Sequence, residues 1–230
     1  MLNHTILLVA AAATLAAPEA RADELQNRVV AAMRASRPDA FRFQRTSITD
    51  RTGSARTTVV EQYDPGRPAA LRWQIVSVDG RAPTAKEAEK SRKAKRGPDP
   101  SYAELAKWFG APATRSEPTP GYVTYRFARL PAGSVKIGSH DASADTQAEA
   151  WVNVRAKTPF VERVRFTSTK GFRMMMVASV KSMDVVSRFA LLPGGQVVPS
   201  ASETTLTGSL LGKSGRIHAT ASYAAFQPVR

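Results

Sequence analysis

The sequence predicts a mainly β protein of the α+β class, built on a curved antiparallel sheet of about ten strands. Three observations lead to this prediction. Strand-like segments recur roughly every 10–14 residues after Gly121, the spacing of an antiparallel meander rather than of parallel βαβ units. The connections between them have hairpin length and contain Gly, Pro and Ser. Finally, 43% of the 230 residues are apolar, so we expect a packed core.

The N-terminus has the pattern of an export signal. Residues 6–17 are apolar apart from Thr14, and this run is shorter than the roughly 20 residues that span a bilayer. Pro18 follows, and Ala20-Arg21-Ala22 has the small-x-small pattern of a cleavage site. We therefore predict a cleaved signal peptide over residues 1–22, a mature chain over 23–230 that forms a single domain, and a periplasmic location. A buried N-terminal helix is the alternative.

Charge and cysteine content limit the classes of function. The chain has 33 Lys and Arg against 19 Asp and Glu, a formal net charge of +14, and no Cys. The absence of Cys excludes disulfide scaffolds, thiolate zinc sites, Cys nucleophiles and an anchor on a lipidated Cys. Such a charge fits anionic partners, but an exported protein does not meet nucleic acid, so we expect none as a partner.

The first part of the mature chain reads as a helix followed by strands. Residues 23–36 have apolar side chains at helical spacing, and Asp23 suits the helix start. Pro38 then blocks continuation. Alternation from Phe41 and β-branched residues over 57–63 flank a Thr-Gly-Ser turn and predict a hairpin, with a further strand over 71–78.

Residues 81–112 interrupt the strands and read as a helical insertion. Its first helix, ending near residue 96, is basic and has almost no apolar face, so it is either simply solvated or a contact for an anionic surface. Ser101 and Glu104 have the spacing of a capping box for a second, short helix. The candidate contacts for an anionic surface are Lys86, Lys90, Arg92, Lys93, Lys95 and Arg96.

Strands dominate the remainder. The expected segments are 122–128, 147–155, 160–169, 172–180, 184–192, 196–207 and 216–226. In the second of these, Ala148, Ala150 and Val152 share one face, whereas Glu149 and Trp151 share the other. One apolar and one charged face are typical of a sheet that wraps a single interior.

Strict alternation in the next segment places Val161 on the same face as Arg163 and Arg165, opposite Val164 and Phe166. The sheet would then present both of these arginines and Val161 to the same environment.

Catalytic signatures are absent from the sequence. The stretch from Gly208 to Ser214 has three residues between its glycines where a phosphate-binding loop needs four, so we expect a turn. His140 and Asp141 lie in a polar stretch that reads as a loop rather than a cation site. We therefore expect a protein that is not an enzyme and holds no metal or cofactor.

The order of these elements resembles the LolA-like superfamily of periplasmic lipoprotein carriers, and in particular its uncharacterised members. The supporting stretches are Phe41-Arg42-Phe43, Tyr63-Asp64-Pro65 to Arg72-Trp73, Val78-Asp79-Gly80, and Ala221-Ser222-Tyr223 to Phe226. The resemblance implies a half-open barrel whose concave side is covered by the N-terminal helix and the helical insertion. It also implies a cavity that receives acyl chains.

Two functional hypotheses follow. The first is a soluble, monomeric carrier or binding protein for lipid or lipoprotein acyl chains. The second is a basic protein that docks on anionic glycolipid, on a polymer, or on an acidic envelope protein. For the methionines among the candidate cavity residues, the alternative to lining a cavity is ordinary packing in the core. The candidate residues lining the cavity are Trp73, Trp108, Phe109, Trp151, Phe166, Met174 and Met176.

Overall fold

The computed structural model describes residues 23–37, 40–93, 101–137, 140–175 and 178–229. The expected export signal, Lys95, Arg96 and Met176 lie outside these ranges, and the side chain of Met174 is likewise not described. No helix in the described ranges is long and apolar enough to cross a membrane.

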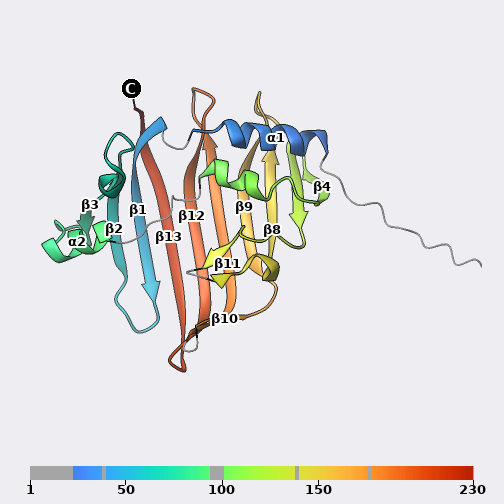
Figure 1. The fold of residues 1–230 in the computed structure, drawn as a ribbon. Coiled ribbons are helices and arrows are strands. Elements are labelled where there is room, and N and C mark those ends of the chain that lie inside the picture. The colour runs from blue at the N-terminus through green and yellow to red at the C-terminus, as the bar shows by residue number, and fades with distance from the viewer. Residues whose placement is uncertain (1–22, 38–39, 94–100, 138–139, 176–177, 230) are drawn as a thin grey trace, which may run out of the picture.

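The structure confirms the expected fold class. One antiparallel sheet of 11 strands runs in the order β3-β2-β1-β13-β12-β11-β9-β8-β5-β4, with β10 paired to β11 (Figure 1). Its edges, β3 and β4, do not meet, so the barrel is half open. The strands are β1 Phe41–Arg51, β2 Thr57–Tyr63, β3 Trp73–Val78, β4 Thr114–Thr119, β5 Tyr122–Phe127, β8 Thr146–Asn153, β9 Phe160–Ser168, β10 Phe172–Met175, β11 Ala178–Leu191, β12 Val197–Leu210 and β13 Lys213–Pro228.

The first hairpin lies beside the last strand. β1 pairs antiparallel with β13 along its length, from Phe41 opposite Pro228 to Arg51 opposite Ile217. The meander from β4 to β13 therefore continues into β1, β2 and β3, and the chain between β3 and β4 connects the two edges of the sheet. That connection holds α2 (Ala85–Lys93), the short helix η2 (Ala69–Leu71) precedes β3, and η3 (Tyr102–Lys107) precedes β4.

Helix α1 (Glu24–Ala35) begins at a well-defined cap. The Asp23 carboxylate accepts a hydrogen bond from the Gln26 amide at 2.8 Å, which satisfies one of the free N–H groups of the first turn. It also accepts from the Tyr125 hydroxyl at 2.7 Å and from Arg115 at 3.1 Å. Burial raises the pKa of Asp23, but these three donors outweigh it and leave the pKa below its ordinary value.

The second short helix differs from the expected one in kind. Ser101 caps it as predicted and accepts from the Glu104 amide at 3.3 Å. The helix is 3-10 rather than α, and the Glu104 carboxylate pairs with Lys107 instead of closing a capping box. Tyr102 fixes its position, because its hydroxyl accepts from the buried Val161 amide at 2.9 Å. The buried environment raises the pKa of Tyr102.

A β-bulge in β9 breaks the strict alternation of faces that the sequence predicted for this strand. Val152 lies opposite Val161, but Trp151 lies opposite Arg163, so Glu162 is an extra residue on the β9 side. The bulge places Val161, which is fully buried, on the same face as Val164. Arg163 lies on the other face, beside Trp151. The core therefore receives apolar side chains of β9 from before the bulge, at Val161, and from after it, at Val164.

Three features of the sheet were not expected. The edge strand β4 is exposed along its whole length. The segment expected as a single strand over 172–180 comprises β10 and the start of β11, which pair with each other. A separate two-stranded ribbon, β6 (Lys136–Ile137) and β7 (His140–Asp141), precedes the turn helix η4 (Ser143–Asp145).

Candidate functional site

The concave face of the sheet, which carries the helices, has two halves. Over β5, β8 and β9 it is covered by α1 and η3, which lie across these strands in Figure 1. The side chains between the layers form one core. Within it Trp108 lies 5.0 Å from Phe127 and 5.3 Å from Phe166 between ring centroids, and Phe109 is fully buried. We call this region the covered half.

The other half of this face is floored by small side chains. Residues that pair directly across neighbouring strands share a face, and the chain of pairs Val164–Ser187, Ser187–Ser202 and Ser202–Ala221 links the covered core to the strands beyond it. We call the small half-buried side chains of this region the open floor. They are Ser47 and Thr49 from β1, Ser202 and Thr204 from β12, and Ala219 and Ala221 from β13, and larger half-buried side chains of the same face surround them, namely Val59, Val185, Leu206 and Ile217.

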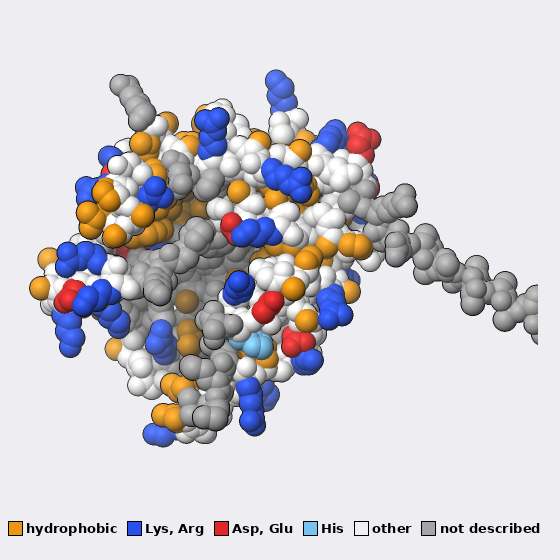
Figure 2. Space-filling view, viewed as in Figure 1, with side chains coloured by type: hydrophobic (Ala, Val, Ile, Leu, Met, Phe, Trp, Pro, Cys, Tyr) orange, Lys and Arg blue, Asp and Glu red, His pale blue; other side chains and the backbone are white. Residues whose placement is uncertain are grey.

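Figure 2 shows this face hollowed between the side that carries α2 and the side that carries η3. Small side chains explain why space remains above this part of the sheet. None of the six open-floor residues is larger than Thr, whereas the covered half contains Trp, Phe and Tyr. Methyl groups and hydroxyls alternate across the floor, so it offers apolar contact with a few hydrogen-bonding groups, the usual composition of a ligand pocket.

Five aromatic side chains border the hollow at the β1–β3 side. Phe43 packs against Tyr63 at 5.0 Å, Trp73 at 5.6 Å, Phe226 at 5.4 Å and Tyr223 at 6.0 Å between ring centroids. Phe43 and Tyr223 are buried, and the other three are half-buried. We call this group the aromatic wall. The register places Arg45 opposite Tyr223 in β13, so the wall and the open floor share a face.

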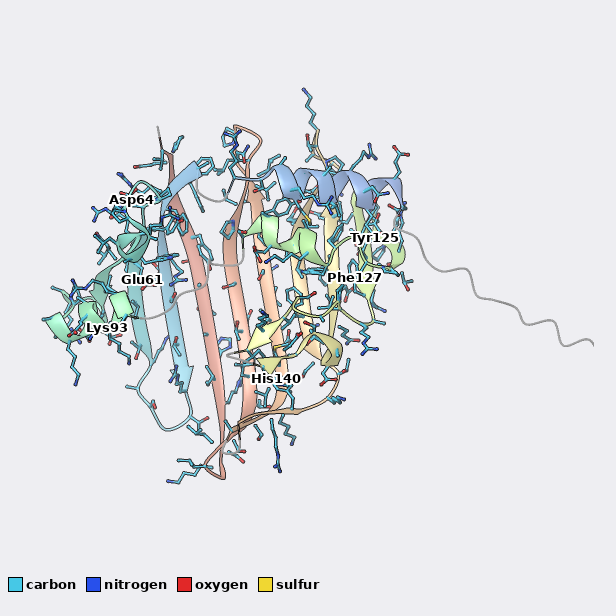
Figure 3. The ribbon with its side chains drawn as sticks, in the orientation of Figure 1. Glu61, Asp64, Lys93, Tyr125, Phe127 and His140 are labelled. Atoms are coloured by element: carbon cyan, nitrogen blue, oxygen red, sulfur yellow. The ribbon has the colours of Figure 1, made fainter. Side chains whose placement is uncertain are left out.

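A buried ion pair lies in the aromatic wall. Arg45 donates to Glu61 from Nε at 3.1 Å and from Nη2 at 2.5 Å, and its guanidinium lies 4.2 Å from the centre of the Trp73 ring. The side chains are 16% and 4% exposed. Figure 3 places Glu61 in the strands on the left, well away from Tyr125 and Phe127 of the covered half. A pair this buried requires well-satisfied geometry, because both charges have lost their water.

The ribbon of β6 and β7 borders the hollow at its lower side. His140 stacks on Phe172 at 4.6 Å with nearly parallel rings, and Phe172 belongs to a small core with Val180 and Met183. The carboxylate of Asp141 accepts from Ser143 and Gly133, and the Ser143 hydroxyl is the main reason that its pKa is lowered. These contacts organise the ribbon, where the sequence had predicted a plain loop.

The structure brings three of the predicted cavity residues together, but in a packed core rather than around a cavity. Trp108 and Phe109 are buried in the covered half, and Phe166 bridges the two cores. Trp73 belongs to the aromatic wall. Trp151 lies on the opposite face, where the Arg163 guanidinium is 4.3 Å from its ring centre. Trp73 therefore lies at the border of the hollow, and the half-buried Phe166 is linked to it by pairing with Val185, which pairs with Thr204 of the open floor.

The convex face is polar, with a shallow groove of about 260 Å³ that Ile48, Val186 and Arg188 help to line. Across β9 and β11, Arg163 lies directly opposite Arg188, and Arg165 forms an ion pair with Asp184 at 2.6 Å. Mixed charges of this kind are usual for the solvated face of a sheet.

The basic helix α2 contacts β3 at the edge of the sheet. Its Lys86, Lys90, Arg92 and Lys93 are all exposed, and Lys93 pairs with Glu89 at 2.6 Å. Arg81 holds Glu87 through two hydrogen bonds at 2.7 and 2.9 Å and, with Thr84, lowers the pKa of Glu87 to about 2. This ion pair fixes the start of the helix to the end of β3.

Sequence reasoning missed the open floor and the Arg45–Glu61 pair. The floor residues are small and belong to no sequence motif. They can be recognised only once the strand register is known, because the register places them on the same face of the sheet as Val164. Arg45 and Glu61 lie in two strands of a predicted hairpin, and pairing them from the Thr-Gly-Ser turn would have placed them opposite each other.

No protein-family model matches the sequence, and no curated protein matches it. Among solved structures, the chain is similar to a LolA superfamily protein from Nitrosomonas europaea, with 12% identity, a TM-score of 0.37 and coverage of 91% of this chain and 94% of that one. It is also similar to a DUF1329 family protein from Desulfovibrio piger, with 9% identity, a TM-score of 0.40 and coverage of 89% and 91%. The first protein carries the superfamily name that the sequence pattern resembles.

Proposed function

We propose that the chain is a periplasmic carrier or binding protein for lipid or lipoprotein acyl chains, and that it does this without catalysis. The observation that carries the proposal is the contrast on the concave face. Where α1 and η3 lie, large side chains fill the space, but the open floor between β1 and β12 consists of small ones beside an aromatic wall.

The chemistry of such a site is the removal of hydrocarbon from water. Each buried methylene contributes about 0.8 kcal/mol, so a single acyl chain gains useful affinity without any covalent step. Methyl groups of Thr49, Thr204, Ala219 and Ala221 supply apolar contact along the floor. The rings of Tyr63 and Trp73 supply a wider apolar surface at its border.

Arg45 gives the proposed site a charged group at its aromatic end. Because Glu61 neutralises it, the pair suits an uncharged polar group of a lipid, such as an ester or a hydroxyl, better than an anionic one. Such a group at this end would place the acyl chain along the floor.

A blocking substitution tests the proposal. Ala219 faces the hollow, so Ala219→Trp should fill it and lower the affinity for the fluorescent fatty acid cis-parinaric acid by at least ten-fold. Its neighbour Thr220 lies in the same strand but on the convex face, so Thr220→Trp is the matched control and should bind normally. Equal binding by both variants, or none by the unmodified protein, would contradict the proposal.

Native mass spectrometry of protein purified from its own envelope gives a second measurement. We expect a bound lipid mass that organic solvent removes, and we expect Ala219→Trp protein to lack it. If the unmodified protein and the Ala219→Trp variant were both consistently free of lipid, the result would count against a carrier.

A second candidate function is docking on anionic glycolipid, polymer or an acidic envelope protein. The exposure of Lys86, Lys90 and Arg92 on α2 favours it. Replacing the lysines and arginines of α2 by Gln should then weaken binding to heparin, used as an anionic polymer, while binding of cis-parinaric acid stays unchanged. Heparin binding that survives the replacements would argue against this function.

A further inference from the structure

The turn between β12 and β13 exposes two adjacent leucines. Leu210 is 59% exposed and Leu211 is 72% exposed, the highest values among the large apolar side chains of the described residues. The turn lies at one end of the sheet and projects beyond the β1–β2 turn at the same end (Figure 1). Water therefore contacts most of both side chains in the protein alone.

The backbone of this turn does not favour leucine. Leu211 has φ of +51° and Gly212 has φ of +77°, so both central residues of a two-residue hairpin turn are left-handed. Asn-Gly or Asp-Gly is the usual choice there, because a side chain such as Leu meets the following carbonyl in this conformation. Leu211 is therefore in a position where a polar residue would fold more easily.

Packing does not explain the leucines either. The residues that precede and follow them in the two strands are small, namely Gly208, Ser209, Ser214 and Gly215. A Cβ on Gly208 would lie 2.1 Å from the Ser179 carbonyl oxygen, so close strand contact requires a glycine here. A strained and exposed apolar residue that serves neither turn nor core indicates a use outside the folded chain.

Basic side chains lie at the same end of the sheet as the leucines. Lys213 pairs across the hairpin with Leu210, and Arg216 lies three residues further along β13. Thr52 donates its amide to the Arg216 carbonyl at 3.0 Å, which brings the β1–β2 turn with Arg51 and Arg56 to the same end. Lys181 lies in the adjoining strand β11, next to Val180, which pairs with Gly208.

These basic groups are available to an external partner. Arg51, Arg56, Lys181, Lys213 and Arg216 are all exposed, and within the described ranges none forms an ion pair with a carboxylate. Asp50 is the acidic residue beside them, in a depression that Thr52, Arg216 and His218 also line. The end of the sheet thus presents five positive charges near one negative one.

We propose that this end is a membrane-docking tip: Leu210 and Leu211 enter an anionic phospholipid bilayer while Arg51, Arg56, Lys181, Lys213 and Arg216 contact its headgroups. A bilayer is the partner that combines an anionic layer with an apolar layer immediately beneath it, in the order in which this tip presents its groups. An acidic polymer would neutralise the charges but would leave the leucines in water. The docking does not depend on what the hollow binds.

The chain has no Cys, so a single introduced thiol can report on the tip. Leu211→Cys labelled with the environment-sensitive dye NBD should shift to the blue and brighten at least two-fold with vesicles of phosphatidylglycerol and phosphatidylethanolamine. Leu191→Cys is the matched control, because Leu191 is 37% exposed at the opposite end of β11 and should not respond. Vesicles of phosphatidylcholine alone should give a weak response. No response of the Leu211 probe on anionic vesicles would overturn the proposal.

Vesicle co-sedimentation separates the roles of the two kinds of residue. Replacing Leu210 and Leu211 by Ser should lower the partition coefficient at least ten-fold, and replacing Lys213 and Arg216 by Gln should lower it several-fold and reduce its dependence on salt. Leu191→Ser should leave it unchanged. Unchanged binding of the Leu210 and Leu211 variant would refute the role of the leucines.

Leu211→Asn distinguishes docking from a structural role. Asn tolerates the left-handed conformation, so this variant should have a higher melting temperature while its vesicle binding falls. A residue important only for the fold would lose stability when replaced. A lower melting temperature with unchanged vesicle binding would show that Leu211 serves the turn and would contradict the proposal.

Discussion

The two halves of the concave face use the same sheet in opposite ways. In the covered half, Phe127 and Val152 have no exposed surface, and the helices α1 and η3 close the layer above them. In the open floor, Thr204 and Ala219 remain half-buried although they lie in the central strands. The sheet is continuous across both, so the difference comes from side-chain size and from where the helices lie.

This contrast shows how stability and binding are divided within one fold. Close-packed large side chains provide most of the free energy of folding, and gaps among them are costly. A floor of small side chains contributes less to folding but leaves room beside it. We expect substitutions to have opposite consequences in the two halves, with large effects on unfolding in one and on binding in the other.

The largest effect is expected in the covered half. Phe127→Ala removes a ring that packs against Trp108 and Phe109, and it should lower the free energy of unfolding by about 4 kcal/mol. Thr204→Ala on the open floor should change it by less than about 0.5 kcal/mol. Urea unfolding measures both. Similar losses would show that the floor is packed as tightly as the core, which would remove the contrast.

The buried ion pair is expected to rank next. Glu61→Gln removes the carboxylate that forms the ion pair with the buried Arg45, so the free energy of unfolding should fall by about 3 kcal/mol. Combining it with Arg45→Met, which removes the stranded charge, should restore part of that loss. If the double variant were less stable than Glu61→Gln alone, the stabilising contact of Arg45 would be with Trp73 rather than with Glu61.

The cap of α1 should have a moderate, pH-dependent effect. Tyr125→Phe removes one hydrogen bond to Asp23 and should cost about 1 kcal/mol near neutral pH. Because folding lowers the pKa of Asp23 from its ordinary value of 3.8, the contribution of its carboxylate is complete above that pH and is lost as the pH falls through the folded value. Asp23→Asn should therefore flatten the acid limb of stability below about pH 4, and an unchanged limb would contradict this assignment.

The smallest expected effect is on the affinity of the open floor for a ligand. Thr204→Val replaces a hydroxyl of the open floor by a methyl group, and it should raise the affinity for cis-parinaric acid about four-fold, from roughly 0.8 kcal/mol of additional apolar contact. Thr220→Val on the convex face is its control. Fatty-acid titration followed by fluorescence measures both, and equal affinities would place the ligand away from the floor.

Much of the fold is predictable because its signals are local. Turn residues and alternation located most of the strands, and the spacing of Leu25, Val29 and Met33 located the N-terminal helix. β4 has no such signal, since all its side chains are exposed and it contains Pro118. β10 and β11 were merged into one segment because no Gly or Pro lies between them.

The candidate site was less predictable because it depends on non-local pairing. Alternation had already placed Trp151 with the charged side chains of its strand, yet large aromatic residues were expected around a cavity wherever they occurred. The structure places Trp108 and Phe109 in the core and leaves the hollow to small residues that have no composition signal. The faces of β1, β12 and β13 become known only once their register is fixed.

The position of β1 beside β13 has a consequence for how the protein is made. These neighbouring strands are far apart in the sequence, because the hydrogen bond between Thr52 and Arg216 at their ends joins residues that are 164 positions apart. Contacts between such distant segments form slowly and only after the C-terminal strand has been synthesised. A nascent chain of this topology lacks the β1–β13 pair until its synthesis ends.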